Sequence, residues 1–204
     1  MGIKILFRNA ANINNFRQII TEIPQRTNVD EAILCSGFFQ EGKGGYYASI
    51  ENNFRNTLCQ NNINITTIGV HNRMWKNDYI AFVKALRTAG VNVRGLYKST
   101  FHWHAKIMLY KYQNHYVCGM IGSSNITRNA FALSLPFNYE ADVLLYNSQM
   151  ISKQTIDNII GQIVNPRDVI DGAYSMENNG NISIEERLSS IEDMLFSEDY
   201  EEIE

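Results

Sequence analysis

The sequence predicts an α/β fold in which a mixed sheet is flanked by helices on both faces. Short apolar segments recur along the chain, segments with helical spacing of apolar residues alternate with them, and those helical segments are about 10 to 15 residues long. Helices of this length act as crossover connections, which make some neighbouring strands parallel and cover both faces of the sheet. The 204 residues, 45% of them hydrophobic, suffice for one full core.

The amino-terminal part begins with a short apolar strand at residues 3–7. Residues 14–23 predict a helix with Pro24 as its stop, because apolar side chains share one face at Phe16, Ile19, Ile20 and Ile23. Residues 31–39 form an almost continuous apolar run, which predicts a buried strand. The loop that follows, residues 40–45, contains three glycines.

The alternation continues through the middle of the chain. Residues 48–60 are predicted to be helical, residues 63–70 form a strand, and residues 78–88 form a helix closed by Gly90. Residues 91–96 supply the next strand.

A hairpin follows in the prediction. Residues 101–110 alternate like a strand, and a second apolar strand at residues 116–121 returns after the polar turn Gln113-Asn114-His115. The predicted main domain, residues 1–165, ends with three elements: a short helix after Asn125 through Ala132, a strand at 139–146 and a helix at 149–164.

The carboxyl-terminal part changes in composition. Residues 166–182 are polar and contain glycines and asparagines, so we expect a linker. Residues 183–204 predict an acidic helix and tail, in which Ser183 and Glu186 form a capping box. The helix has apolar residues at helical spacing (Ile184, Leu188, Ile191 and Leu195), so it is expected to dock on the body or on a partner chain. Residues 197–204 are expected to be frayed.

The formal net charge of −3 is unevenly distributed. Residues 177–204 hold ten acidic residues and one basic residue, which leaves 11 acidic and 17 basic residues in the rest of the chain. The body is therefore +6 and the tail −9. A basic body favours an anionic partner, and the acidic tail either competes for the same surface or is an ordinary solvated segment.

Several classes of protein are not indicated. No apolar run approaches the roughly 20 residues of a membrane span, and the first nine residues do not resemble a signal peptide. The three cysteines, Cys35, Cys59 and Cys118, are odd in number and scattered, which favours reduced core thiols in a cytoplasmic protein over a metal or redox site.

The most informative segment lies in the predicted hairpin. Alternation over residues 101–110 places His102, His104, Lys106 and Met108 on one face of a strand. The second strand of the hairpin brings Gly122-Ser123-Ser124-Asn125 to the same end. An imidazole and an ammonium beside hydroxyl and amide donors can hold a phosphate and attack its phosphorus.

Each signal also has an ordinary structural explanation. The Gly-Ser-Ser-Asn segment could be a turn that caps the next helix, and Glu140 and Asp142 could be ordinary polar positions on a strand. His71 and His115 are interpreted as structural. His104 differs from them, because Lys106 is its neighbour on the same face and a buried lysine requires an anionic or hydrogen-bonding partner.

From His104 to Glu140 the chain resembles the phospholipase D superfamily. Its motif is His, any residue, Lys, four residues and Asp, followed by Gly, Ser, any residue and Asn, with a later Glu. The matching positions here are His104, Lys106, Gly122, Ser123, Asn125 and Glu140. Lys111 stands at the position of the motif's Asp, and the interval from Lys106 to Gly122 is four residues longer than usual. An even insertion in a hairpin keeps the strand faces in register.

The order of elements and the region around Ser36-Gly37-Phe38-Phe39 also resemble the catalytic domain of this superfamily's metal-independent restriction endonucleases. The resemblance implies that one histidine attacks phosphorus to form a phosphohistidine, while a second protonates the leaving oxygen. Lys106, Ser123 and Asn125 would hold the non-bridging oxygens, and Glu140 would fix the tautomer of His104. His102 and His104 could suggest a zinc pair, but with no Cys or third His nearby we expect no metal or other cofactor.

The resemblance implies two histidines from two copies of the motif, and this chain contains one copy. We therefore expect a homodimer with one shared active site. The expected substrate is DNA or RNA, since basic and aromatic residues interleave around the motif. The alternatives are a lipid or small-molecule phosphodiesterase and a catalytically silent nucleic-acid-binding module. No sequence-reading motif is present, so a restriction-type nuclease would need a separate target-recognition domain or chain.

Overall fold

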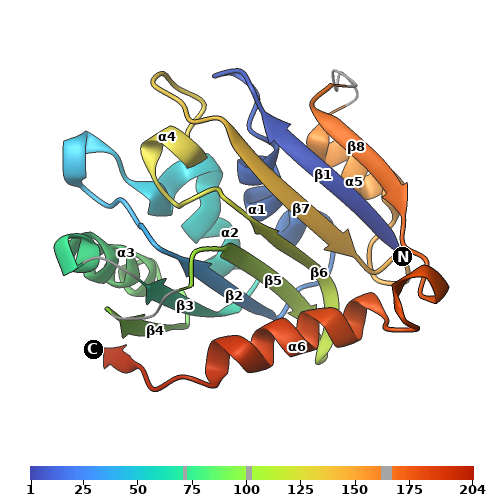
Figure 1. Ribbon diagram of the computed structural model, residues 1–204. Coiled ribbons are helices and arrows are strands. Elements are labelled where there is room, and N and C mark those ends of the chain that lie inside the picture. Colours follow the sequence, from blue (N-terminus) through green and yellow to red (C-terminus); the bar gives the residue numbers. More distant parts are fainter. Residues whose placement is uncertain (71–72, 100–102, 162–166) are drawn as a thin grey trace.

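The computed structural model describes residues 1–70, 73–99, 103–161 and 167–204. Within these residues it contains one nine-stranded sheet with helices on both faces (Figure 1). The strand order is β8-β1-β7-β6-β5-β2-β3-β4-β9. The predicted α/β class with a mixed sheet is confirmed.

The strands are β1 (Gly2–Arg8), β2 (Glu31–Ser36), β3 (Asn64–Val70), β4 (Val93–Lys98), β5 (Lys106–Tyr112), β6 (His115–Gly122), β7 (Glu140–Tyr146), β8 (Val169–Ala173) and β9 (Glu201–Ile203). The α-helices are α1 (Asn15–Arg26), α2 (Phe54–Gln60), α3 (Lys76–Thr88), α4 (Arg128–Phe131), α5 (Lys153–Ile160) and α6 (Ile184–Phe196). Short 3-10 turns lie at Lys43–Gly45, Ala48–Asn53, Arg73–Trp75 and Glu177–Asn179.

The strands β2, β3 and β4 are parallel, and the other neighbouring strands pair antiparallel. Consequently β2, β3, β4, β1 and β6 end at one edge of the sheet, where β5 and β7 begin. We call it the carboxyl edge. In open α/β sheets, ligands bind outside the carboxyl ends of parallel strands, so this edge is where a site is expected.

The predicted hairpin has the expected register, since Lys106 pairs with Gly122 across β5 and β6. Its first strand is shorter than predicted, however, and begins at Lys106 rather than at residue 101. The pairing of β5 with its neighbours begins at Lys106 opposite Gly122 of β6 and at Ile107 opposite Cys35 of β2. Two predicted helices are likewise shorter. In place of the helix predicted at 48–60 the chain forms a 3-10 turn followed by α2, and in place of the one predicted at 149–164 it forms α5.

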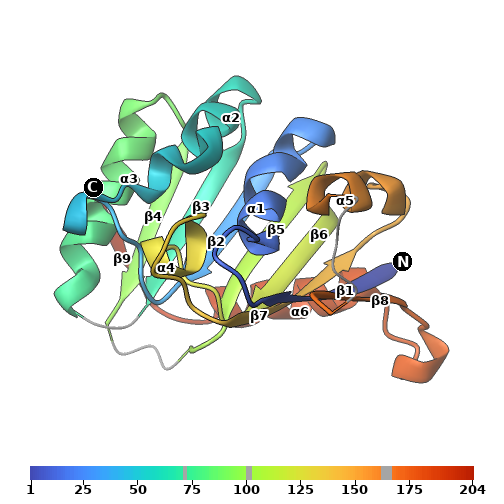
Figure 2. The ribbon, with the colours of Figure 1, turned by 90° about the horizontal axis from the view of Figure 1, so that it is seen from above.

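Two helical layers enclose the sheet. The helices α1, α2, α3 and α5 cover one face, and α6 lies across the opposite face (Figures 1 and 2). The larger cluster of buried side chains lies under the first group, and the smaller lies under α6. Cys35 and Cys118 are buried free thiols, as predicted. In the described part of the chain, no helix has both the length and the apolar character that crossing a membrane requires.

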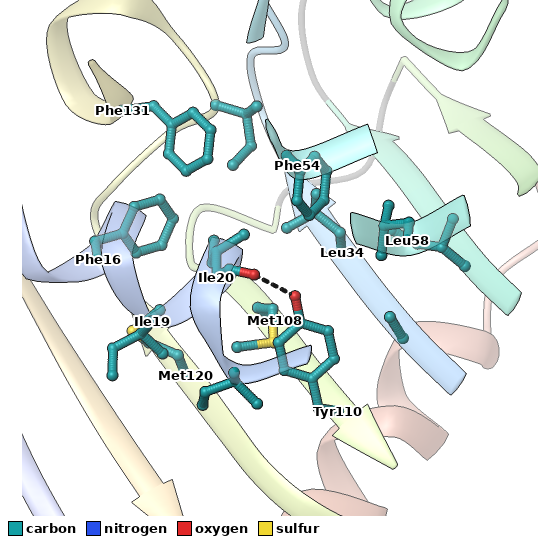
Figure 3. Close-up of a cluster of buried hydrophobic side chains, with 14 of the residues drawn as sticks. Phe16, Ile19, Ile20, Leu34, Phe54, Leu58, Met108, Tyr110, Met120 and Phe131 are labelled. Atoms are coloured by element: carbon teal, nitrogen blue, oxygen red, sulfur yellow. Dashed lines mark hydrogen bonds between the residues drawn. The ribbon is translucent and has the colours of Figure 1, made fainter. Parts of the chain in front are cut away.

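Pro24 does not stop α1, which continues to Arg26. Proline has no backbone N–H, so the carbonyl of Ile20 loses its usual partner within the helix. The hydroxyl of Tyr110 on β5 donates to that carbonyl at 2.5 Å (Figure 3). This buried hydrogen bond satisfies the carbonyl, joins α1 to the sheet and accounts for the helix running past its predicted end.

The segment predicted as a linker, residues 166–182, contains the edge strand β8, which pairs with β1. The linker prediction is therefore wrong for this part. The capping box at the start of α6 is present, with Ser183 accepting from the Glu186 amide and Glu186 accepting from the Ser183 amide. The helix docks on the body closely, because a Cβ at Gly119 would lie 2.3 Å from Leu188 Cδ2.

The last residues are not frayed, as had been expected, because β9 pairs with the edge strand β4. Ile203 is buried, and its carbonyl accepts from Arg87 Nη2 at 2.7 Å. Three acidic side chains of this segment also contact basic side chains of the body. The pairs are Glu198 with Lys98, Glu201 with Lys76 at 2.7 Å, and Glu202 with Arg94 at 3.2 Å.

Candidate active site

Polar residues converge at the carboxyl edge, on the face of the sheet that carries the larger core. The strand register aligns Lys106 of β5, Gly122 of β6 and Asp142 of β7 in one row across the sheet. Directly paired residues project to the same face, so the side chains of Lys106 and Asp142 flank Gly122, which has none.

Gly122 leaves room for the Asp142 carboxylate. A Cβ at Gly122 would lie 1.9 Å from Asp142 Oδ1. The carboxylate is buried and accepts two hydrogen bonds from Ser124, one from its amide at 3.2 Å and one from its hydroxyl at 2.6 Å. This network fixes the turn after β6, from which Ser123 and Asn125 project.

Burial raises the pKa of the Asp142 carboxyl to about 6, although its hydrogen bonds from Ser124 favour the ionised form. The proton is thus bound more tightly in the folded state than in the unfolded chain, where the ordinary pKa is 3.8. The contribution of this group to stability is therefore greatest at low pH and falls as the pH rises from about 4 to about 6, by up to about 3 kcal/mol.

Replacing Asp142 with asparagine should remove this pH dependence. An asparagine can keep both contacts, accepting from the Ser124 amide and donating to its hydroxyl. In urea unfolding, wild type should lose about 2 kcal/mol relative to Asp142→Asn between pH 4.5 and pH 7.5. Parallel pH profiles for the two proteins would contradict the raised pKa.

Lys106 is 5% exposed, and its Nζ donates to the backbone carbonyl of His104 at 2.7 Å. Burial lowers the pKa of the ammonium, and the charges of Glu140 and Asp142 oppose that decrease. The prediction that Lys106 is a buried lysine with a hydrogen-bonding partner is confirmed. Its contact with the His104 carbonyl also ties the histidine's backbone to the start of β5.

His104 lies in the segment that precedes β5, and its side chain is exposed. The prediction that it shares a strand face with Lys106 is wrong, because the strand begins only at Lys106. His102 lies outside the described residues. The position of His104 at the carboxyl edge, two residues from Lys106, nevertheless keeps both residues at the same end of the sheet.

Asn125 is oriented by the end of β2. Its Oδ1 accepts from the Ser36 hydroxyl and from the Phe38 amide, both at 3.2 Å. Since two donors face this oxygen, the network assigns the other amide atom as the nitrogen. Nδ2 is therefore the atom of Asn125 that can donate to a bound anion.

Ser123 and Glu140 form a second polar group beside this amide. The Ser123 hydroxyl donates to Glu140 Oε2 and accepts from the Ala141 amide at 3.0 Å. Glu140 Oε1 accepts from Asn138 Nδ2 at 3.1 Å. The strand register places four of the predicted site residues, Lys106, Ser123, Asn125 and Glu140, at one edge of the sheet, with His104 two residues before Lys106.

Arg8 also belongs to this edge, although the sequence analysis did not include it in the site. It pairs with Glu140 in the register of β1 and β7, and it is buried. Burial lowers the pKa of its guanidinium, and the charge of Glu140 opposes that decrease. The guanidinium donates to the carbonyls of Asn129 and Ala132, at 2.8 and 2.7 Å, and so fixes the loop that leads to β7.

Lys111, which stands where the superfamily motif has an aspartate, lies at the far end of β5. It is buried and forms ion pairs at 3.1 Å with Glu31 and with Glu192 of α6. It lies five positions along the strand from Lys106, which is roughly 17 Å. This position holds α6 on the sheet and does not belong to the site.

The described residues contain no group of three or more His, Cys, Asp and Glu side chains that could hold a metal ion. Independence from metal remains a prediction for experiment.

The fold and the site define an α/β domain with a cluster of polar and charged residues at the carboxyl edge of its sheet. A family model described as "Cardiolipin synthase, PLD-like domain" matches residues 29–162, which is more than half of the chain. The chain therefore belongs to the phospholipase D-like family, whose members are generally phosphodiesterases. No curated protein sequence matches the chain.

The comparison with solved structures found similar chains. Phosphatidylserine synthase from Haemophilus influenzae aligns with a TM-score of 0.51 and 12% identity, over 94% of this chain and 44% of that one. Yeast tyrosyl-DNA phosphodiesterase aligns with a TM-score of 0.40 and 15% identity, over 70% of this chain and 31% of that one. This chain spans less than half the length of either protein, and the likeness to phosphatidylserine synthase supports the fold alone.

Proposed function

We propose that this protein is a metal-independent phosphodiesterase that cleaves DNA or RNA through a covalent phosphohistidine. The observation that supports it best is the clustering of Lys106, Ser123 and Asn125 beside His104 at the carboxyl edge. The Lys106 ammonium and the Asn125 amide N–H can hold the non-bridging oxygens of a phosphodiester, whose negative charge grows in the transition state. The Ser123 hydroxyl can donate to the same oxygens once it turns from Glu140.

In the proposed first step, a ring nitrogen of His104 attacks phosphorus. A P–N bond forms and the P–O bond to the leaving group breaks, while a second histidine gives its proton to the leaving oxygen. A water molecule then attacks phosphorus, gives a proton to the second histidine and breaks the P–N bond. Glu140, which lies beside this group, would orient the His104 ring in the proposed mechanism.

The second histidine would come from another copy of the chain, giving a homodimer with one composite site. An exposed apolar loop beside the site supports this arrangement. Leu135 is 69% exposed and Tyr139 is 78% exposed, and both precede Glu140 at the start of β7. Such side chains next to a half-site are suited to contact with a second copy.

A nucleic-acid substrate is favoured by the basic body of the chain. Arg73 and Arg128 are exposed at the carboxyl edge, whereas Lys76, Arg94 and Lys98 contact acids of the tail. A lipid or small-molecule phosphodiester is the alternative substrate within the same family. If the enzyme is of the restriction type, target recognition would require a further domain or a separate chain.

A cleavage assay in excess EDTA tests the proposal. Single-stranded DNA, duplex DNA, RNA, a phospholipid and a small phosphodiester should be offered to the purified protein in parallel. We expect cleavage of nucleic acid that EDTA does not reduce, because the proposed groups require no metal. Complete inhibition by EDTA, reversed by magnesium or zinc, would contradict the mechanism, and cleavage of the lipid alone would contradict the substrate class.

Neutralising the acids of the tail should strengthen nucleic-acid binding. The variant Glu198→Gln/Glu201→Gln/Glu202→Gln leaves the backbone pairing of β9 in place and frees Lys98, Lys76 and Arg94 to contact phosphates. We expect tighter binding at low salt and a steeper salt dependence, by up to about two to three units of the log–log slope. Folding stability should change little, because exposed ion pairs contribute about 0 to 1 kcal/mol each.

The control variant Glu177→Gln/Glu185→Gln/Asp193→Asn changes the net charge equally at acids away from β9. Binding measured by fluorescence anisotropy at several salt concentrations separates the two variants. If the two variants bind nucleic acid with the same affinity and the same salt dependence, net charge alone determines binding, and the tail does not compete for the basic surface.

A further inference from the structure

The aromatic residues that interleave with basic ones in the sequence occupy different environments. Tyr97 is 5% exposed and lies in the larger core, and Trp103 packs against the smaller core. Trp75 is only partly buried, at the start of α3 and at the carboxyl edge. Trp103 is also partly buried, but it packs on the face of the sheet covered by α6, opposite the face that carries Lys106. Of these three, Trp75 is therefore the one whose ring lies near the site and is partly open to a ligand.

Trp75 is part of a small surface group that adjoins the phosphate-holding residues. Its ring centroid is 5.2 Å from that of Phe38, at an interplanar angle of 55°. The ammonium of Lys43 lies 4.2 Å from the centroid of the Trp75 ring. We call Phe38, Lys43 and Trp75 the aromatic shelf.

The shelf is joined to the site by the backbone of Phe38. The Phe38 amide donates to Asn125 Oδ1 at 3.2 Å, and the Phe38 carbonyl accepts from the Ile126 amide at 3.1 Å. The ring of Phe38 thus belongs to the residue that orients Asn125. A ligand whose phosphate is held by Asn125 Nδ2 has the shelf as its neighbour on the side of β3 and α3.

The chemistry of the shelf fits one nucleotide next to the scissile phosphate. Aromatic rings stack on nucleobases whatever the base, and a nearby ammonium contacts the adjoining phosphate. Lys43 is exposed on a glycine-rich loop, so it can leave the ring face for a phosphate oxygen when a base takes its place. A base within a duplex is already stacked on its neighbours, so its face is not available to Trp75.

We propose that the aromatic shelf is a stacking subsite for an unpaired nucleobase, and that the preferred substrate is therefore single-stranded nucleic acid. This inference rests on the proposed function. It assigns base contact to Trp75 and Phe38, phosphate contact to Lys43, and no role in bond breaking to any of the three.

Two oligonucleotides of equal length and charge test the subsite. One is oligo(dT) and the other carries abasic sites throughout, so both present the same phosphates. Trp75→Ala should weaken binding of oligo(dT) about 5- to 150-fold, the effect expected from losing one stacked base, and should leave binding of the abasic strand unchanged. Trp75→Phe should retain most of the affinity. Lys43→Gln should weaken binding of both strands equally, because it removes a phosphate contact.

A matched control exists at the opposite edge of the sheet, where the Arg187 guanidinium lies 5.8 Å from the centroid of the Tyr174 ring. Tyr174→Ala also removes an aromatic ring that faces a cation, and it should not change binding of either strand. Thermal unfolding checks that each variant is folded. Equal effects of Trp75→Ala on both strands, or no effect on either, would overturn the stacking subsite. A wild-type protein that neither binds nor cleaves any nucleic acid would instead overturn the proposed function.

Discussion

Gly122→Ala is expected to destabilise the fold by about 3 kcal/mol and to abolish cleavage. The new methyl group would lie 1.9 Å from Asp142 Oδ1 and 2.7 Å from the backbone carbonyl oxygen of Ala141. Neither neighbour can withdraw freely, because the carboxylate is held by Ser124 and the carbonyl belongs to β7. Forcing extra atoms into a packed site typically costs 1 to 3 kcal/mol, and here the displaced turn also carries Ser123 and Asn125.

Urea unfolding followed by circular dichroism measures the stability effect, and Gly172→Ala is the matched control. Gly172 is also a strand glycine, in β8, but a Cβ there would have no heavy atom within 4 Å. Its replacement should leave stability nearly unchanged. If Gly122→Ala unfolds at the same urea concentration as Gly172→Ala, the close packing of Asp142 against Gly122 is contradicted.

The sequence predicted the interior of the fold better than its edges. The strands β2, β5, β6 and β7 are apolar runs whose pattern alone identifies them. The edge strands β8 and β9 were missed because they are short and mostly exposed, and β9 contains Glu201 and Glu202. Such strands form because β1 and β4 offer unpaired backbone groups, and that tertiary contact leaves no periodic signal in the local sequence.

The same distinction holds for the site. The spacing of His104 and Lys106, together with the Gly-Ser-Ser-Asn segment, was enough to predict that these residues lie at one end of the sheet. The spacing did not show that the Asp142 side chain fills the space over Gly122, and the sequence left Asp142 as an ordinary strand position. That contact depends on the register of β6 and β7. The two-residue interval between Glu140 and Asp142 was the available signal, since it places both carboxylates on one face of a strand.

The partners of Asn125 and Glu140 show a similar limit. The apolar run through Ser36 predicted a buried strand, but not that its hydroxyl would orient Asn125 across 89 positions of sequence. Arg8 is likewise the last residue of β1, which the sequence predicted at residues 3–7, and its role becomes visible only when β1 pairs with β7. Residues that position a site are supplied by long-range pairing, whereas the motif itself is local.

His104→Ala is expected to remove phosphodiester cleavage, by about 10⁴-fold or more, while leaving binding of nucleic acid nearly intact. The imidazole is the proposed nucleophile, and loss of a covalent nucleophile removes the whole two-step pathway. Binding should persist because Lys106, Ser123 and Asn125 remain and the exposed His104 side chain contributes little to folding. Cleavage is measured with a labelled oligonucleotide in EDTA, and binding is measured by anisotropy.

The same variant tests the composite site. If each site needs His104 from two copies, wild type mixed with a ninefold excess of His104→Ala and allowed to exchange subunits forms few fully wild-type dimers. Random pairing leaves about 1% of dimers wild type, so activity should fall to about a tenth of the value that dilution alone predicts. Activity that follows simple dilution, together with a monomer in sedimentation at the working concentration, would show that one chain carries a complete site.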